Sequence, residues 1–147
     1  MTVTAIEIAS RRPIADGRSL GPFGSYEELR GTLRFAVDPK HPDHQVITDI
    51  GLAPTGADGR VAFSSDFLLL KPTQPSPGGS LLYDVVNRGN RTALSTFNDA
   101  EGDRAGSVEF PGNAFLFHHG FSVVFCGWQH DVPSGLALHT PEAKEAA

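Results

Sequence analysis

The stretch LLYDVVNRGN at residues 81–90 decides what the rest of the chain is expected to form. LLYDVV is a short apolar run rich in residues that favour strands, and NRGN, at 87–90, has the composition of a turn. A second apolar run, FSVVFC at 121–126, is closed by Gly127. The segment between the two runs is long enough for the helical crossover that parallel strands require. The sequence therefore predicts a βαβ unit.

Polar residues follow both of these predicted strands. NRGN comes directly after the first strand, and GWQHD, at 127–131, comes directly after the second. Ligands of open α/β sheets collect outside the carboxyl ends of the strands. These two segments are therefore the first place to look for a functional site.

Composition predicts a single soluble domain. The chain has 147 residues, 39% of them hydrophobic, and a formal net charge of -5. Nucleic-acid binding is not expected, because Lys and Arg are scattered and form no basic stripe for phosphates. The single cysteine suits a reducing compartment. No apolar segment has the length of a signal peptide core at the start or of a membrane span elsewhere, so we expect a cytoplasmic protein that contacts no membrane.

The first half of the chain is expected to form an antiparallel meander. Alternating patterns with many β-branched residues predict strands at 3–8, 32–37, 46–50 and 61–70. One alternative stays open around SYEEL, at 25–29. Ser25 and Glu28 have the spacing of a helix-capping pair, whereas a strand that begins at Tyr26 could continue to residue 37.

The second half adds two short helices to the predicted strands. One is expected at 92–97, and the other at 114–119, with Asn113 as its cap and Gly120 just after its end. The residues at 99–112 are acidic and rich in glycine, which predicts a loop. The whole is expected to be one structural domain in four parts. These are a β-rich meander at 1–71, a Pro/Gly linker at 72–80, the βαβ unit at 81–132 and a frayed tail at 133–147.

Six short motifs, in this order, resemble the N-terminal region of an uncharacterised group of bacterial α/β-hydrolase-domain proteins. They are FAVDP (35–39), DIGLAP (49–54), DGRV with Asp66-Phe67 (58–67), NRGN (87–90), FL with Gly120-Phe121 (115–121), and GWQ with Asp131 (127–131). Together they cover the chain from about Ile6 to Val132.

The resemblance implies a β-rich α/β fold in which the antiparallel meander leads into the βαβ unit, the incomplete first half of an α/β-hydrolase-type sheet. Residues 81–86 would match the strand before the oxyanion loop, and 121–126 the strand that precedes the nucleophile region. Such hydrolases place their serine in a G-x-S-x-G turn between a strand and a helix. This chain has no such motif, and GFSVV at 120–124 lacks the second glycine and begins a strand. We therefore expect an amino-terminal fragment that contains no catalytic residue and is inactive alone.

The best site candidates are Asn87, Arg88, Gly89 and Asn90. A loop after a strand can direct N–H groups at a developing oxyanion, and glycine permits the backbone angles that this needs. Arg88 could also pair with a substrate carboxylate. The alternative is an ordinary polar turn at the end of a strand. Trp128 and Gln129 are candidates for pocket lining, although Trp128 is more simply explained by packing against the sheet end.

Other reactive residues support weaker hypotheses. Cys126 and His130 could form a thiol nucleophile and its base, but a cysteine that ends an apolar strand usually acts as a small hydrophobe. His118 and His119 are adjacent and point in different directions on a helix, and His41 and His44 lack a third ligand for zinc. No metal ion and no cofactor is therefore predicted.

Two functions from different classes remain. The first is the N-terminal portion of a hydrolase that cleaves ester or amide bonds, in which a small-molecule substrate binds only to the complete protein. The second is a noncatalytic β-rich module for binding or interaction. The predicted strand at 121–126 would have an open edge in an incomplete sheet, so we also expect self-association through an exposed strand.

Overall fold

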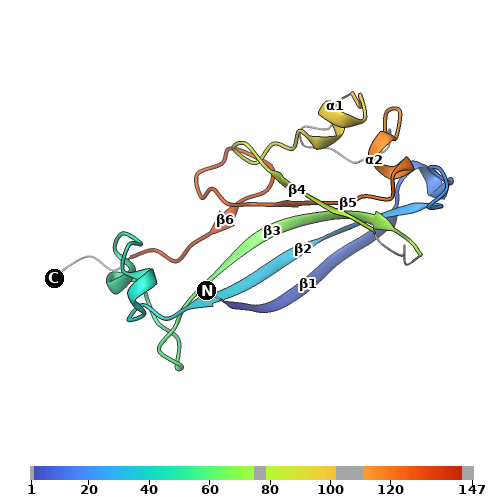
Figure 1. The fold of residues 1–147 in the computed structure, drawn as a ribbon. Helices are drawn as coiled ribbons and strands as arrows, with labels where there is room; N and C mark the ends of the chain where they lie inside the picture. Colours follow the sequence, from blue (N-terminus) through green and yellow to red (C-terminus); the bar gives the residue numbers. More distant parts are fainter. Residues whose placement is uncertain (1, 75–78, 102–110, 144–147) are drawn as a thin grey trace.

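The computed structural model describes residues 2–74, 79–101 and 111–143 of the chain. In these ranges the protein is β-rich, with a mixed six-stranded sheet and few helices (Figure 1). The strands are β1 (Thr2–Pro13), β2 (Tyr26–Val37), β3 (Val61–Pro72), β4 (Leu81–Val85), β5 (Ser122–Cys126) and β6 (Leu138–His139). The helices are α1 (Ala93–Phe97) and α2 (Phe115–His118), and short 3-10 turns lie at η1 (Ala15–Gly17), η2 (Pro42–His44) and η3 (Ile50–Leu52).

The strand order across the sheet is β1-β2-β3-β5-β4. β1, β2 and β3 pair antiparallel, which confirms the predicted meander, although it has three strands and not four. β4 and β5 pair in parallel, as the βαβ prediction requires. β6 lies on the same side of β3 as β5, because it pairs with Ser64 and Ser65 while β5 pairs with residues 67–70.

The segment around Tyr26 is a strand and not a helix. β2 runs unbroken from Tyr26 to Val37 and pairs with β3 along its whole length. In this arrangement Tyr26 is fully buried, and its hydroxyl donates to the carbonyl of Phe117 at 3.2 Å. Burial raises the pKa of Tyr26 to about 12. β2 pairs with β1 on one side and with β3 on the other. This pairing outweighs the local capping pattern of Ser25 and Glu28, which spans only four residues.

The strand predicted at 46–50 is wrong. The connection between β2 and β3 contains turns there, and Asp49 has a left-handed backbone with φ of 59° just before η3. The Val46 side chain is 85% exposed, so it buries almost none of its apolar surface. A short alternating run forms a strand only where a neighbouring strand can pair with it.

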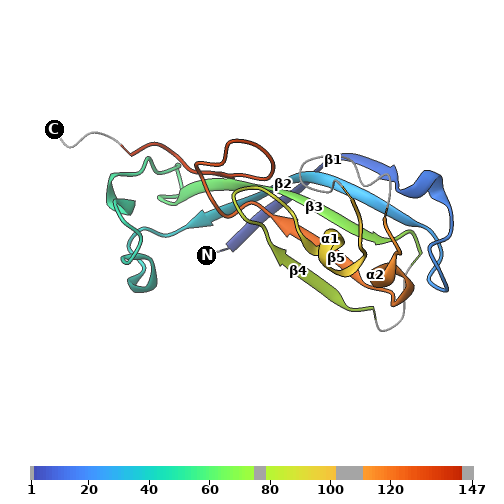
Figure 2. The ribbon, with the colours of Figure 1, turned by 90° about the horizontal axis from the view of Figure 1, so that it is seen from above.

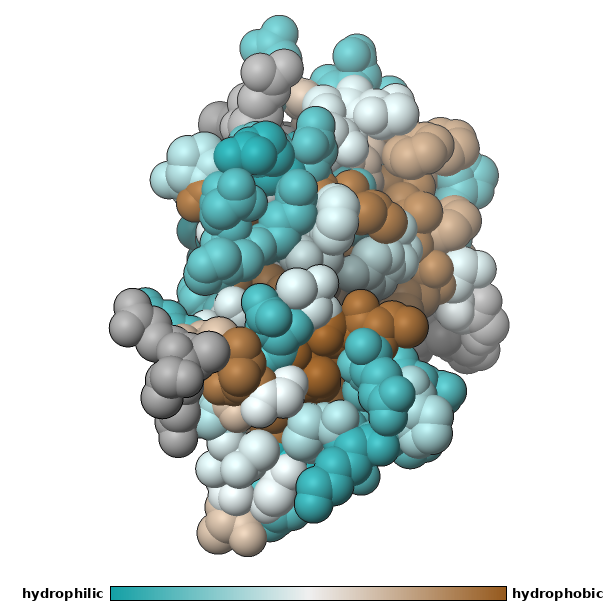
Figure 3. Space-filling view, turned by 90° about the vertical axis from the view of Figure 1, so that its left-hand side faces the viewer, coloured by the Kyte–Doolittle hydropathy of each residue, from teal (hydrophilic) through white to brown (hydrophobic). Residues whose placement is uncertain are grey.

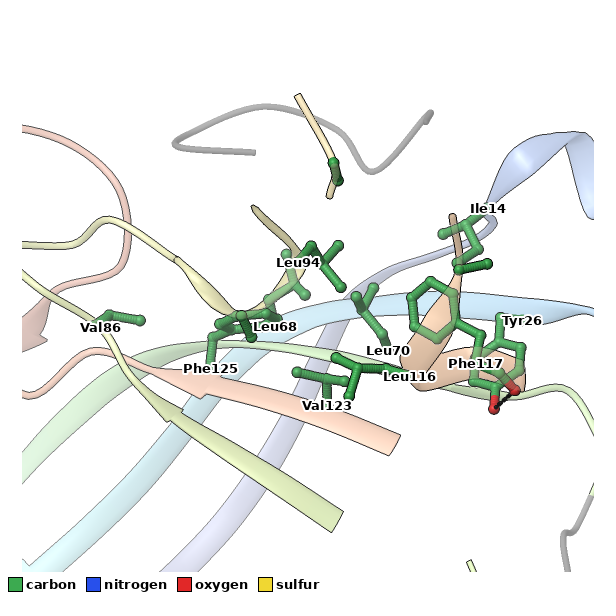
Figure 4. Packing of buried hydrophobic residues seen from close by; sticks show 13 residues of the cluster. Ile14, Tyr26, Leu68, Leu70, Val86, Leu94, Leu116, Phe117, Val123 and Phe125 are labelled. Carbon is green, nitrogen blue, oxygen red and sulfur yellow. Dashed lines mark hydrogen bonds between the residues drawn. The ribbon is translucent and has the colours of Figure 1, made fainter. Parts of the chain in front are cut away.

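One side of the sheet, which we call the helical face, holds the core. Leu68 and Leu70 of β3 lie beside Val123 and Phe125 of β5, and all four are buried. Figure 1 shows α1 and α2 on this side of the sheet, and Figure 2 shows them from above, over β5. Figure 4 shows side chains of both helices, among them Leu94 and Leu116, packed toward the strands. The two helices thus cover this face although each is only one turn or so long.

The two helices are held by polar side chains at their ends. Asp84 of β4 accepts hydrogen bonds from the N–H groups of Thr92 and Ala93, both at 2.8 Å, and so fixes the start of α1. The N-cap of α2 is Ala114 and not Asn113 as predicted, although the Asn113 side chain still accepts a hydrogen bond from the N–H of Phe115 at 3.0 Å. Gly120 has a φ of 75°, so the predicted left-handed residue after α2 is confirmed.

Asn98 joins the two helices to each other. It is fully buried, its Nδ2 donates to the carbonyl of Pro111 at 3.1 Å, and its Oδ1 accepts from the N–H of Leu116 at 2.9 Å. Its own carbonyl accepts from the N–H of Asn113 at 2.7 Å. One side chain at the end of α1 therefore positions the beginning of α2.

The other side of the sheet, the open face, carries apolar side chains away from α1 and α2. Paired residues point to the same side of a sheet, so the register defines rows that cross it. One row consists of Val85, Cys126, Phe67, Gly31 and Ile8. The next row consists of Tyr83, Val124, Leu69, Leu29 and Arg11. Tyr83 is 50% exposed and Val85 is 63% exposed, so the outer part of this face meets solvent.

The sheet is curled so tightly at Gly31 that only glycine fits there. A Cβ at this position would overlap the carbonyl oxygen of Glu7 on β1 and approach the ring of Phe67 to 3.0 Å. β1 makes room for this approach with register shifts between Val3 and Ala5 and between Ile8 and Ser10. The close approach helps to bury Phe67 and Leu29 although they belong to the open face.

The strand positions correct two further expectations. β4 and not β5 is the strand at this edge of the sheet, since β5 pairs with β3 on one side and with β4 on the other. The tail at 133–147 is not frayed throughout, because Leu138–His139 forms β6, and residues 144–147 lie outside the described residues. Residues 75–78 of the linker predicted at 72–80 and residues 102–110 of the loop predicted at 99–112 also lie outside them. None of the described helices has the length and apolar character to cross a membrane.

Candidate functional site

Residues 87–90, which are separated from the end of β4 by one residue, form a tight hairpin turn. Asn87 and Asn90 each donate an N–H to the other's carbonyl at 2.9 Å. Arg88 and Gly89 lie between them with positive φ angles of 47° and 80°, the backbone of a type I′ turn. An arginine in this region of backbone space is uncommon, so its neighbours must hold it there.

The end of β5 supplies those neighbours. The side-chain oxygen of Gln129 accepts a hydrogen bond from the N–H of Arg88 at 2.6 Å. The Arg88 guanidinium donates to the carbonyl of Asp131 at 3.2 Å, and the Trp128 indole donates to the carbonyl of Val86 at 2.5 Å. The structure thus brings the predicted residues at 87–90 and 127–131 together. Trp128 packs across the strand ends as expected, while half of its surface stays exposed.

A third segment, residues 134–136, lies against Gly89. The carbonyl of Gly89 accepts from the N–H of Leu136 at 3.2 Å. A Cβ on Gly89 would overlap the carbonyl oxygen of Ser134, so no other residue fits without a shift of the backbone. Glycine is therefore required here for both the positive φ and the close approach.

This geometry limits what the turn can bind. Three of its four N–H groups are engaged, those of Asn87 and Asn90 with each other and that of Arg88 with Gln129. Among the described residues no hydrogen bond uses the Gly89 N–H. This donor and the half-exposed Arg88 guanidinium, which also lies 3.9 Å from the Asp131 carboxylate, are the groups that could meet a negatively charged oxygen.

Ser122 lies in the segment that most resembles a nucleophile motif, but its position in the fold does not suit a nucleophile. Ser122 is the first residue of β5, and its N–H donates to the carbonyl of Ser80 at 2.8 Å. A nucleophile elbow needs a serine on a sharp turn from a strand into a helix. The structure of this segment agrees with its sequence, which lacks the second glycine of the motif.

Cys126 and His130 do not form a nucleophile and base pair. Burial raises the pKa of the Cys126 thiol, and the neighbouring Tyr83 hydroxyl lowers it by less. His130 Nδ1 lies 3.4 Å from the Thr140 hydroxyl, and within the described residues no hydrogen bond or ion pair joins it to Cys126. A protonated, half-buried thiol is a poor nucleophile.

His41, His44 and His119 each contact a structural partner. His41 Nδ1 accepts from the N–H of Asp43 at 3.2 Å, and His44 Nδ1 lies 2.7 Å from the carbonyl of Asp38. His118 ends α2, and the ring of His119 lies 4.6 Å from that of Phe115. Over the ranges that the structure describes, no group of three or more His, Cys, Asp and Glu residues could hold a metal ion.

Sequence reasoning missed one polar cluster close to the site. Asp66 of β3 accepts from the N–H of Ala137 at 3.1 Å, and its other oxygen lies 3.0 Å from His139 Nε2. The N–H of Asp66 donates to the carbonyl of Ala137 at 3.0 Å. The only available signal was a charged residue within a long apolar strand, and nothing in the pattern pointed to a partner so far along the chain.

Comparison with known proteins leaves the chain without an assigned family: no protein-family model, no curated protein and no solved structure matches it.

Proposed function

We propose that this chain is the N-terminal portion of an α/β-hydrolase-like protein that acts on ester or amide bonds. In this proposal its sheet is the incomplete first half of the hydrolase sheet, and the turn from Asn87 to Asn90 is the oxyanion-side loop. Residues outside this chain would supply the nucleophile, the acid and the base, and the substrate would be a small molecule bound by the complete protein.

One observation carries the proposal. The carboxyl ends of the parallel strands β4 and β5 meet, and the hydrogen bond from Arg88 to Gln129 locks them together. Ligands of α/β sheets bind at such strand ends. The turn there has two positive φ angles and an N–H, that of Gly89, without an acceptor among the described residues. A rigid turn of this kind can hold a donor in place before the reaction, which is what oxyanion stabilisation requires.

The proposal is tested first by activity. The purified chain should not hydrolyse p-nitrophenyl esters of any acyl length. The longest natural reading frame that contains the chain should encode a G-x-S-x-G motif after it, and its product should hydrolyse such esters. Turnover by the chain itself that survives Cys126→Ala but is lost with Ser122→Ala would show that the nucleophile lies in β5 and would overturn the proposal.

A second candidate function is a noncatalytic binding or interaction module. The open face favours it, because apolar side chains in register cross the sheet there and Tyr83 and Val85 remain exposed. A reading frame without a nucleophile motif, together with a monomer that unfolds cooperatively, would favour this module over the hydrolase.

A further inference from the structure

A hollow of about 370 Å³ lies at the end of the open face where β2 stops and β3 begins. Its floor consists of Val37, Val61 and Phe63, which the strand register places on the same side of the sheet. The connection between β2 and β3 forms one wall with Ile47 and Ile50. The residues after β6 form the other, and Figure 1 shows these two segments side by side near the C-terminus.

The centre of this end of the molecule is hydrophobic. Figure 3 views the structure from this end and shows brown, hydrophobic residues recessed between teal, hydrophilic ones. A volume of 370 Å³ falls in the range of small-molecule sites, which are mostly apolar concavities with a few polar groups. The hollow is therefore large enough for a ligand with one ring or a short alkyl chain.

The hollow is built on fixed elements. Val37 and Val61 are buried and paired directly, and the ring of Phe63 stacks on Phe35 with centroids 5.0 Å apart. Asp66 holds residues 137 and 139 through the bonds described above, and β6 so anchors the start of the wall that follows it. Such a site needs little rearrangement to receive a ligand, so less of the binding energy is lost to ordering.

The charge of the lining selects the ligand. The polar lining residues are Thr48, Asp49 and Thr140, and Asp49 is the ionisable one. The Asp49 side chain makes no capping hydrogen bond, and within the described residues no ion pair uses its carboxylate. A carboxylate beside an apolar surface attracts a cation and repels an anion. The formal net charge of -5 acts in the same direction.

We propose that this hollow binds a small, mainly apolar molecule that carries one protonated amine. The apolar part lies on Val61 and Phe63, and the ammonium group lies at the rim beside Asp49. This inference is independent of the turn at Asn87 and of any hydrolysis there, because it uses other residues and a binding measurement.

Isothermal titration calorimetry of the whole chain with three matched probes tests it. The probes are 4-phenylbutylamine, the neutral 4-phenylbutan-1-ol and the anionic 4-phenylbutyrate. The amine should bind more tightly than the alcohol by about two- to fivefold, the size of a partly exposed ion pair, and added salt should reduce the difference. The anion should bind most weakly. Equal binding of amine and alcohol, or stronger binding of the anion, would overturn the proposal.

Two variants locate the binding. Asp49→Asn should remove the preference for the amine while the alcohol binds as before, and asparagine tolerates the positive φ of this position. Ile50→Trp should fill the hollow and weaken the binding of both probes at least tenfold. Asp43→Asn is the matched control, because Asp43 is an exposed carboxylate of the same connection outside the lining.

The control should bind all three probes as the unmodified chain does, and thermal unfolding should show that each variant is folded. Amine binding that Asp49→Asn and Ile50→Trp leave unchanged would place the ligand elsewhere and contradict the proposal. A dimer in light scattering that does not bind the amine would show that a second copy of the chain occupies the hollow, and it would also contradict the proposal.

Discussion

Glu28 of β2 is a buried carboxylate that pairs with two guanidinium groups. It is 1% exposed, and the guanidinium groups of Arg12 and Arg30 each lie 2.7 Å from its Oε1. Burial acts to raise its pKa, but the hydrogen bonds and charges of Arg30 and Arg12 outweigh burial and lower it. The folded state therefore holds this carboxylate in its charged form.

Replacement of Glu28 should destabilise the fold. Glu28→Gln removes the charge that both arginines bind, at a cost of about 1–3 kcal/mol in the free energy of unfolding. Glu7→Gln is the matched control, because Glu7 also pairs with an arginine, Arg34, but both partners are more than half exposed. Urea denaturation at neutral pH should show a much smaller change for Glu7→Gln. Equal losses in the two variants would contradict the special role of the buried pair.

The lowered pKa of Glu28 also gives a pH dependence with a defined sign. In the unfolded chain the carboxyl has its ordinary pKa near 4.5, and in the folded protein its pKa is lower. Its contribution to stability is therefore complete above the unfolded value and is lost as the pH falls through the folded one. Stability should decrease between about pH 5 and pH 3, and less steeply in Glu28→Gln. Identical pH profiles would show that Glu28 does not cause the loss.

For single residues, the sequence predicted fewer of the contacts than it did for strands and helices. The spacing at 25–29 left a helix cap and a strand open for Glu28, because its partner Arg12 lies on another strand and local spacing carries no information about it. Asp66 and His139 were missed for the same reason. Gly89 was assigned correctly to a turn that needs glycine, since its Asn-Arg-Gly-Asn setting is itself a local signal.

At the scale of elements, periodicity was informative wherever a strand found partners. The runs at 61–70 and 121–126 became β3 and β5, since each packs apolar residues on the helical face and pairs on both sides. The run at 46–50 has a similar pattern but no neighbour, so it became turns. The meeting of the ends of β4 and β5 followed from their parallel pairing. The contact of residues 134–136 with Gly89 could not be predicted, because the tail has no strong hydrophobic pattern.

The contact between α1 and α2 should depend on Asn98 more than on Asn113. Asn98→Ala leaves the buried N–H of Leu116 without its acceptor and should cost about 2–3 kcal/mol in the free energy of unfolding. Asn113→Ala removes an exposed hydrogen bond to the N–H of Phe115 and should cost about 0.5–1 kcal/mol. Chemical denaturation of both variants measures the difference. An Asn98→Ala protein as stable as Asn113→Ala would show that the helices pack without this bridge.

For the whole molecule, the two edges of the sheet differ in how well they resist pairing. β1 is interrupted by two register shifts, which are a common protection of edge strands. β4 has no register shift against β5, and its open-face side chains Leu81, Tyr83 and Val85 are exposed. We therefore expect concentration-dependent self-association through β4, and not through β5 as the sequence suggested.

Size-exclusion chromatography with light scattering over a dilution series tests this expectation. Val85→Lys places a charge on the β4 edge and should give a monomer at every concentration. Ile6→Lys places the same charge on the exposed part of β1 and should leave the association unchanged. If the unmodified chain is a clean monomer that unfolds cooperatively, the β4 edge is not a pairing surface and the binding-module function gains support.

The central claim, that the turn after β4 supports hydrolysis, is tested most directly by the kcat of Gly89→Ala in the ester-cleaving product of the longest reading frame. The added Cβ would meet Ser134 and displace the turn, so kcat should fall by about 10²–10³, the cost of one lost oxyanion donor. Gly59→Ala is the matched control, since Gly59 also has a positive φ, 73°, but its Cβ would meet nothing within 4 Å. The account predicts a loss of kcat in the first variant alone. An unchanged kcat in a correctly folded Gly89→Ala enzyme would contradict it.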